Sequence, residues 1–319
     1  MSEITKPRYF NTIRIISDDL ISKESEDTFK MKAEYEWYKN SNCFKQNNTD
    51  YKCGIWFPGI FDYWEEDGKA GYLMDYIHGY TLSYAFVNGN PDIHLYERIL
   101  ITLESLLSNL PVEKNVTPFT KMCIHSMYED KTLSRLKQTS IDIDKEYIVN
   151  DYYTPTIREI IKNCHISLKD ENIKHIHGDL CFSNMILAKY QKFLPDYDWV
   201  FLIDPRGYIP EKQISQIGDV NYDVAKLAHS ILGRYDQIQT HGFDIAKLGE
   251  REYTWSIKTS DNIRYIEDTF KDIFKNYNYF DIMIHLFLSM IPLHKDDPWK
   301  QEKMLVNALR LYLEKENRF

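Results

Sequence analysis

Residues 177–184 read HGDLCFSN, and residues 202–205 read LIDP. Two apolar runs lie between these motifs, Met185–Ala188 and Trp199–Ile203, and a polar segment separates them. Two short apolar runs around a polar segment predict a β-hairpin, here with residues 189–198 as its loop. The side chains at both ends of this hairpin would then come from two adjoining loops that converge on one place.

Three of these residues carry oxygen atoms suited to phosphoryl transfer. Asn184 and Asp204 supply hard oxygen ligands for a divalent cation, and Asp179 supplies a carboxylate that can orient a hydroxyl group and accept its proton. Each residue alone has an ordinary alternative, since Asp after Gly favours a turn and Asn is a frequent cap or Asx-turn residue. The ordered set, with its spacing, indicates function rather than local structure.

The set resembles the catalytic loop and the metal-binding aspartate of the aminoglycoside phosphotransferase and choline kinase superfamily, whose fold is that of protein kinases. In those enzymes a loop Asp precedes an Asn by five positions, as Asp179 precedes Asn184. A second Asp ends the following hairpin, as Asp204 does. The resemblance implies a catalytic role for Asp179, a Mg²⁺ ion held by Asn184 and Asp204, and ATP as the phosphate donor.

The order of elements expected from the sequence agrees with an α+β, protein-kinase-like fold of two lobes. Short alternating runs at residues 11–16 and 71–76 flank one helix that begins near Ser25, so residues 1–77 form a small β-rich nucleotide-binding lobe. Residues 78–319 form a larger catalytic and substrate-binding lobe. Helical periodicity there covers residues 96–110, 154–164 and 222–232 and two stretches after residue 262, with a buried core helix at 280–293.

The small lobe should provide a lysine for the ATP phosphates and an acid that holds this lysine in place. Lys23 follows the apolar run at residues 20–22, and Glu34 lies on the helix that comes next. By resemblance these two residues form the ion pair of the kinase fold. Lys30 and Lys32 compete for the same role, although both fall inside the predicted helix, where a solvated face is the usual explanation.

The segment Met74, Asp75, Tyr76 and Ile77 falls where the β pattern stops and the helical pattern starts. It resembles the hinge that offers backbone hydrogen bonds to adenine, while an ordinary edge strand entering a turn is the alternative. Residues 8–22 contain no glycine, so the G-x-G-x-x-G loop of protein kinases is missing. This departure disfavours a protein kinase more than it disfavours ATP binding.

Two further segments could support or extend the site. By resemblance, an Asp near the start of the helix at 222–232 braces the catalytic loop, and Asp219 and Asp223 are both candidates; a helix cap is the simpler role. Arg206 lies two residues after the predicted metal ligand, so its guanidinium group could bind a carboxylate or phosphate of the substrate or pair with a local Asp.

The segments at residues 229–236 and 291–297 resemble those of superfamily kinases associated with bacterial surface-polysaccharide synthesis. A rim of polar side chains could bind sugar hydroxyl groups there, or these residues could have structural roles alone. The candidates in these two segments are His229, Tyr235, Asp236 and His294.

Composition limits the remaining possibilities. The chain has a formal net charge of −9 and no basic stripe, which argues against nucleic acid as a partner. The sequence contains no membrane-span pattern and no secretory leader pattern, and its five cysteines show no C-x-x-C pair, so we expect free thiols in a cytoplasmic protein.

The sequence therefore predicts an ATP-dependent small-molecule kinase that transfers the γ-phosphate to a hydroxyl group, with a sugar or polyol as the leading acceptor. An aminoglycoside or an amino alcohol such as choline or ethanolamine is the alternative within the same class. A catalytically silent kinase-fold binding module is the alternative from another class.

Overall fold

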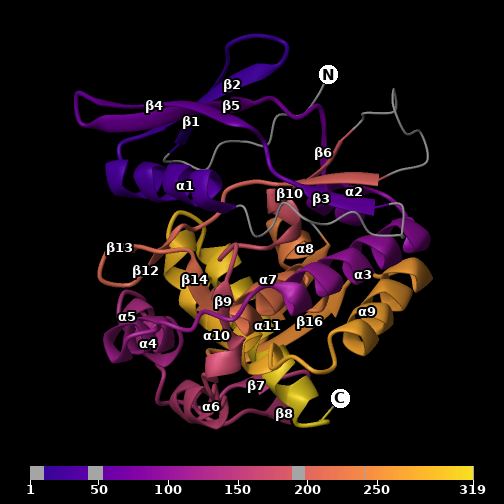
Figure 1. The fold of residues 1–319 in the computed structure, drawn as a ribbon. Helices are drawn as coiled ribbons and strands as arrows, with labels where there is room; N and C mark the ends of the chain where they lie inside the picture. The colour runs from indigo at the N-terminus through magenta and orange to yellow at the C-terminus, as the bar shows by residue number, and fades with distance from the viewer. Residues whose placement is uncertain (1–10, 42–52, 189–197, 241, 319) are drawn as a thin grey trace.

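The computed structural model describes residues 11–41, 53–188, 198–240 and 242–318. A small N-terminal sheet and one helix lie on one side of a larger, mainly helical region (Figure 1). This arrangement confirms the predicted α+β class and its division into a small β-rich part and a larger helical part.

The N-terminal sheet is antiparallel, with strand order β1-β2-β5-β4. Helix α1 packs against one face of this sheet, through β4 and β5. The elements are β1 (Asn11–Ile15), β2 (Leu20–Ser25), α1 (Thr28–Asn40), β4 (Ile60–Glu66) and β5 (Lys69–Asp75).

The predicted start of α1 near Ser25 is wrong by about one turn. Ser25 is the last residue of β2 and pairs with Asn11 and Ala70 on the neighbouring strands. The helix begins at Thr28, because the side chain of Asp27 accepts a hydrogen bond from the backbone N–H of Lys30 and caps it.

A second sheet joins segments that lie far apart in the sequence, in the order β3-β11-β10-β6. Strands β10 and β11 form the predicted antiparallel hairpin. Of the predicted loop at residues 189–198, residues 189–197 lie outside the described residues, and Asp198 is the first residue of β11. The parallel strand β3 and the antiparallel strand β6 extend the hairpin on its two sides. The elements are β3 (Cys53–Trp56), β6 (Gly79–Thr81), β10 (Met185–Ala188) and β11 (Asp198–Leu202).

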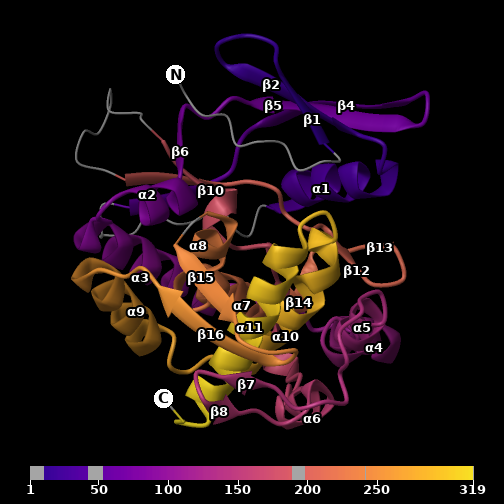
Figure 2. The same cartoon turned by 180° about the vertical axis from the view of Figure 1, so that it is seen from behind.

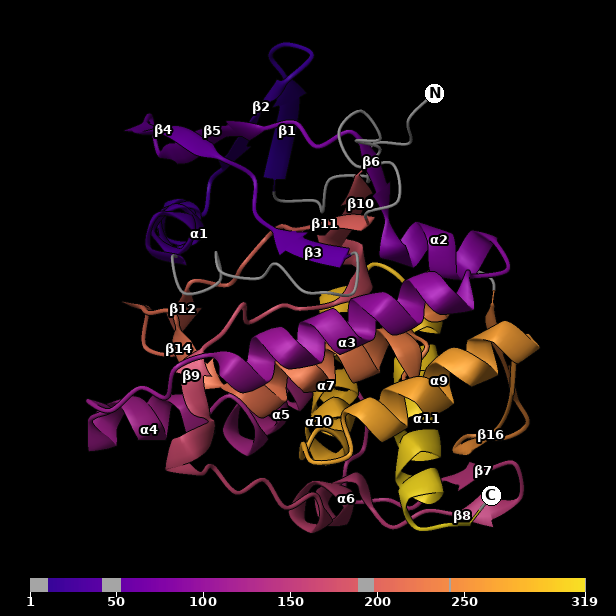
Figure 3. The same cartoon turned by 45° about the vertical axis from the view of Figure 1, so that its right-hand side comes forward.

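The helical region contains α7 at its centre, and every residue of α7 is buried. Helices α3 and α9 lie side by side (Figure 3), while α10 and α11 pack together and lie with β15 and β16 on the opposite face (Figure 2). The helices are α2 (Leu82–Asn88), α3 (Ile93–Asn109), α4 (Pro118–His125), α5 (Glu129–Leu136), α6 (Ile157–Asn163), α7 (Val220–Ile231), α8 (Tyr235–Gln239), α9 (Asp261–Ile273), α10 (Phe280–Met290) and α11 (Pro298–Lys315).

Short strands complete this region. Strand β9, which ends just before the catalytic-loop motif, pairs with β14. Strands β12 and β13 form a small hairpin after the motif. A further sheet has the strand order β15-β16-β7-β8. The strands are β7 (Ile148–Val149), β8 (Tyr152–Tyr153), β9 (Ile173–His175), β12 (Tyr208–Ile209), β13 (Gln213–Ile214), β14 (Ile217–Asp219), β15 (Phe243–Lys247) and β16 (Glu252–Ile257).

The long apolar helices agree best with their sequence patterns. The expected core helix is α10, in which all residues after Phe280 are buried. The two stretches expected after residue 262 are in fact three helices, because the turn at Ile291–His294 separates α10 from α11. Helices α4 and α5 were not predicted, because each spans only eight residues and shows little more than two turns of periodicity.

In the part of the chain that the structure describes, no helix is long and apolar enough to cross a bilayer. The cysteines of this part, Cys53, Cys123, Cys164 and Cys181, are buried free thiols, as expected from the sequence. Cys43 lies outside the described residues.

Gly207 allows β12 to approach α1 closely. Its φ angle is +66°, in the left-handed region, and a Cβ atom placed on it would lie 2.1 Å from the carbonyl oxygen of Ala33. Only glycine satisfies both conditions without moving the backbone. The segment that follows Asp204 is therefore held against the helix that carries Glu34.

We expect Gly207→Ala to destabilise the protein by about 2–5 kcal/mol, from left-handed strain of about 1–2 kcal/mol and overpacking of about 1–3 kcal/mol. The matched control is Gly68→Ala, where φ is +75° and no atom lies within 4 Å of the new Cβ. The Gly68→Ala variant should lose only the stability that left-handed strain costs, about 1–2 kcal/mol. Urea unfolding of both variants measures the difference, and equal losses would contradict the close contact with Ala33.

Candidate active site

Lys23 lies between two carboxylates that come from different regions of the fold. Its Nζ is 2.6 Å from Oε2 of Glu34 on α1 and 2.9 Å from Oδ1 of Asp204, which follows β11. Burial alone lowers the pKa of Lys23, but the charges of Asp204 and Glu34 outweigh it, so the pKa is raised. Lys23 is therefore a fixed cation at the junction of the sheet and the helical region.

The other side of Glu34 is also held. The hydroxyl group of Tyr72, on β5, donates a hydrogen bond of 2.8 Å to Oε2 of Glu34. The competing lysines, Lys30 and Lys32, are both exposed on α1. Lys23, rather than either exposed lysine, therefore contacts Glu34 and Asp204, the two carboxylates expected at the site.

Asp179 and Asn184 lie together in the catalytic-loop motif. Nδ2 of Asn184 donates to the backbone oxygen of Asp179 at 2.9 Å and to its Oδ2 at 3.0 Å. Oδ1 of Asp179 is 2.7 Å from Nζ of Lys226, a buried residue of α7. Burial lowers the pKa of Lys226, but the charge of Asp179 outweighs this effect and raises it.

One face of α7 holds the catalytic-loop motif through three contacts. The carboxylate of Asp223 accepts hydrogen bonds from the backbone N–H groups of His177, at 2.7 Å, and Gly178, at 2.8 Å. Lys226 binds Asp179, and Oγ of Ser230 accepts from the N–H of residue 182 at 3.1 Å. These residues are spaced at i, i+3 and i+7, so they lie along one side of the helix.

Asp219 and Asp223 therefore differ in what they contact. Asp219 caps α7 through the N–H of Asn221 and accepts a hydrogen bond from the hydroxyl group of Tyr128 at 2.8 Å. Asp223 is fully buried below the loop, and burial raises its pKa to about 7 despite the two N–H donors. Of the two candidates, Asp223 is the one that contacts the loop.

The backbone of the site holds unusual conformations. Gly178 has φ +79°, and a Cβ on it would lie 2.7 Å from Cβ of Arg206. Asp204 has φ +57°, which is rare for a residue with a side chain. The N–H of Asp204 donates to the hydroxyl group of Tyr38 at 3.1 Å, and the N–H of Ile203 donates to the backbone oxygen of Asn184 at 2.9 Å. These bonds bring residues 184 and 204 next to each other.

The predicted metal ligands fit a magnesium ion. Nδ2 of Asn184 is anchored on Asp179, and within the described ranges no group donates a hydrogen bond to its Oδ1. The side chain of Asp204 is 43% exposed, so one oxygen can bind a ligand while the other stays on Lys23. Mg²⁺ keeps several waters and phosphate oxygens and needs only one or two protein oxygens. Described His, Cys, Asp and Glu side chains form no group of three that could hold a metal without such partners.

The predicted hinge joins β5 to β6. The N–H of Asp75 donates to the oxygen of Gly59, and the N–H of Tyr76 donates to the oxygen of Asp19. The N–H of Ile77 makes no hydrogen bond to any described residue. Met74 is buried in β5. Ile77 is thus the residue of this segment whose amide is available to a ligand.

The predicted acceptor residues are placed in different environments. His229 is buried, with its ring stacked 4.2 Å from that of Tyr235 and 4.8 Å from that of Phe287. Asp236 is buried and accepts a hydrogen bond from Ser83 at 2.7 Å; burial raises its pKa to about 6. These contacts belong to the core.

Two further candidates lie elsewhere. His294 is half-buried in the turn after α10, which packs against α5 and α11. Arg206 donates through Nη2 to the hydroxyl group of Tyr222 at 2.8 Å and lies over its ring. Sequence analysis considered a local Asp as the partner of Arg206, and within the described residues the guanidinium group makes no ion pair with one.

The contacts of Lys226 and Ser230 with the catalytic-loop motif were not predicted from the sequence. A signal for both exists, because polar residues at 223, 226 and 230 interrupt an otherwise apolar helix at helical spacing. A polar stripe on a helix that is buried on all sides needs polar partners. The catalytic-loop motif provides them.

The small sheet, the lysine–glutamate pair, the polar loop and the following aspartate are arranged as in the two-lobed kinase-like fold. No family model and no curated protein matches the sequence. The solved structures to which this chain is similar include the following two. A mutant of aminoglycoside 2'-phosphotransferase type IIIa in complex with GDP has a TM-score of 0.51 at 14% identity, covering 98% of this chain and 90% of that one. Aminoglycoside-3'-phosphotransferase of type VIII has a TM-score of 0.44 at 11% identity, covering 96% and 94%.

We expect Asp223→Asn to destabilise the protein by about 2–4 kcal/mol, because one amide oxygen cannot accept from both buried N–H groups and the new NH₂ group faces one of them. The control is Asp170→Asn, whose 74% exposed side chain pairs with Lys121 on the surface. That variant should change stability by less than about 1 kcal/mol. Denaturant unfolding tests both, and a stable Asp223→Asn variant would contradict the bracing of the loop.

Proposed function

We propose that this protein is an ATP- and magnesium-dependent kinase that phosphorylates a hydroxyl group of a small molecule. The single observation that carries the proposal is the convergence of Lys23, Asp179, Asn184 and Asp204 at the junction of the two regions. The shared fold with a phosphotransferase in a GDP complex supports nucleotide binding at this junction.

Residues 1–77 would form the nucleotide-binding part and residues 78–319 the catalytic part. Ile77 offers its free N–H to the base, and Lys23, steadied by Glu34, offers its charge to the phosphates. Asn184 and Asp204 would hold the magnesium ion, which neutralises charge on the phosphates when bound. Lys23 then exchanges part of its contact with Asp204 for a phosphate oxygen.

Asp179 would act on the acceptor. Its carboxylate orients the hydroxyl group and accepts the proton as the hydroxyl oxygen forms a bond to the γ-phosphorus and the bond from that phosphorus to ADP breaks. Asn184 and Lys226 hold the two carboxylate oxygens, so the side chain has one orientation. Lys226 also brings a positive charge to the place where phosphate oxygens would approach.

A sugar or polyol is the leading acceptor, and an aminoglycoside or an amino alcohol is the alternative in the same cytoplasmic setting. A silent binding module of the same fold is the second candidate function. It would hold a nucleotide without turnover; the presence of Asp179, Asn184 and Asp204 together favours the kinase over this module.

Release of ADP from Mg-ATP, measured over a panel of sugars, polyols, amino alcohols and aminoglycosides, should identify at least one class of acceptor. ATP without an acceptor gives the background rate. If nucleotide binds while no acceptor raises the rate, the binding module replaces the kinase.

We expect Asp179→Asn to lower kcat by about 10²–10⁴-fold, because the amide cannot accept the proton of the acceptor. The Kd for Mg-ATP should change little, since this side chain faces the acceptor. The control is Asp268→Asn, an exposed carboxylate of α9. An unchanged kcat in the Asp179→Asn variant would remove this residue from its role.

A further inference from the structure

Three cations gather around the hydroxyl group of Tyr222, beside the proposed active site. Arg206 donates to this oxygen at 2.8 Å and Lys131 of α5 donates to it at 3.3 Å. Both cations also lie over the ring, with the guanidinium carbon 4.8 Å and the ammonium nitrogen 5.6 Å from its centre. Arg135, one turn after Lys131, is close enough for its charge to act on both Lys131 and Arg206.

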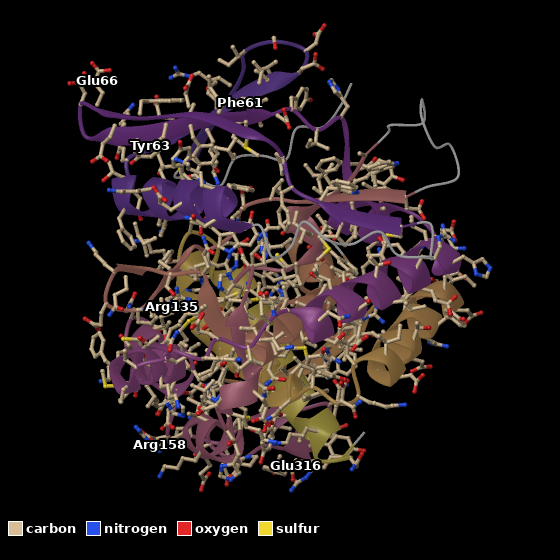
Figure 4. All side chains as sticks on the ribbon, in the orientation of Figure 1. Phe61, Tyr63, Glu66, Arg135, Arg158 and Glu316 are labelled. Carbon is tan, nitrogen blue, oxygen red and sulfur yellow. The ribbon has the colours of Figure 1, made fainter. Side chains whose placement is uncertain are left out.

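Figure 4 labels Arg135 beside α5 and β12. Its Nη1 donates to the backbone oxygen of Ser289 at 3.1 Å, and its other nitrogens make no hydrogen bond to the described residues. Lys131, Arg135 and Arg206 together form a cationic cluster.

The cationic cluster lacks carboxylate partners. No described carboxylate lies within 4.0 Å of any of its three side chains, whereas most other cations of the interior have one. The buried lysine Lys174 differs, because it donates to the carbonyl oxygens of Leu107 and Ser108 at the end of α3. In a chain with a formal net charge of −9, three neighbouring cations without a described carboxylate partner are an exception that needs a cause.

The charges of the cationic cluster change the pKa values of Lys131 and Tyr222. Burial lowers the pKa of Lys131 to about 8, and the charges of Arg206 and Arg135 add to this effect. Burial raises the pKa of Tyr222, but Arg206, Lys131 and Lys226 outweigh it and lower the pKa to about 7. These cations thus stabilise the ionised form of the Tyr222 phenol, and the same charges would stabilise an anion bound beside it.

The nearby carboxylates are already engaged. Asp179 is bound to Lys226 and Asn184, Asp223 to two backbone amides, and Asp219 to Tyr128 and Asn221. Each member of the cationic cluster is partly exposed, so a solute can reach it. Arg206 is also close enough to Asp179 for the two charges to interact. Through Arg206 the cluster therefore interacts electrostatically with Asp179.

We propose that Lys131, Arg135 and Arg206 form an anion-binding subsite for the acceptor, so that the alcohol phosphorylated by this protein carries a phosphate or carboxylate group. The proposal rests on the proposed kinase function and narrows its acceptor class. An anionic group would accept hydrogen bonds from the free guanidinium nitrogens of Arg135 and from the Nζ of Lys131. The acceptor hydroxyl would then be held within reach of Asp179.

The chemistry of this subsite disfavours a polycationic acceptor. An aminoglycoside would place its ammonium groups against three cations that have no carboxylate partner among the described residues, and like charges in a partly buried site repel each other strongly. A neutral sugar would leave the three cations uncompensated. A sugar phosphate or a sugar acid satisfies both the cluster and the requirement for a hydroxyl group.

Binding of inorganic phosphate to the full chain without nucleotide, measured by calorimetry, tests the subsite independently of catalysis. The variants Lys131→Gln and Arg135→Gln should each weaken binding by about tenfold or more, equivalent to about 1.4 kcal/mol. The control is Lys137→Gln, an exposed lysine at the end of the same helix, which should leave binding unchanged. Equal affinity in all four proteins, or binding at no concentration up to the solubility limit, would overturn the subsite.

ADP release with matched acceptors then tests the acceptor class. Each neutral sugar or polyol is compared with its phosphate ester and its carboxylic acid, and we expect kcat/KM to be at least about tenfold higher for one of the charged forms. Lys131→Gln and Arg135→Gln should remove this preference while the Kd for Mg-ATP stays unchanged. A preference for neutral or cationic acceptors would overturn the proposal and leave the kinase function intact, and loss of ATP affinity in both variants would assign the cluster to the nucleotide instead.

Discussion

The ion pair network of Lys23 connects the two regions of the molecule. One ammonium group contacts a carboxylate on α1 and another at the end of the β10–β11 hairpin, 181 residues later in the chain. The free-energy cost of removing such charges from water offsets much of the attraction between them, so a buried network of this kind is poor evidence for stability. Removing one partner is costly, however, because it leaves an uncompensated charge. The network therefore fixes geometry, and it orients Glu34 and Asp204 before any ligand arrives.

The remaining geometry follows from how the loop at 177–184 is supported. A loop that presents a carboxylate to a substrate must leave that side chain accessible, so its own backbone must be held from the other side. Helix α7 does this with an acid for two amides, a lysine for the carboxylate and a hydroxyl group for a third amide. Gly178 and Gly207 remove the side chains that would block the close contacts this requires.

Much of the site was predictable because its residues are close in sequence and have a strict order. The HGDLCFSN motif, the hairpin and the aspartate after it are local signals, and the structure brings them together as expected. The Lys23–Glu34 ion pair was expected from the resemblance to the kinase fold, which placed the lysine before the helix and the acid on it. The cationic cluster was only partly visible, since Arg206 follows the motif while Lys131 and Arg135 come from a helix too short to show a clear period. The long-range packing of α5 on α10, which brings Lys131 to Tyr222 of α7, leaves no trace in a single sequence.

Fold and acceptor follow from different parts of this structure. The fold depends on glycine conformations, strand pairing and the support of α7, and these are compatible with any hydroxyl acceptor. The acceptor depends on side chains of α5 and of the segment after Asp204, which can change without altering the backbone. An aminoglycoside phosphotransferase in complex with GDP shares this fold at 14% identity, so the likeness carries the architecture and leaves the acceptor open. Under the proposal made above, local charge would select the acceptor, because three cations without a described carboxylate partner accommodate an anion and repel a cation.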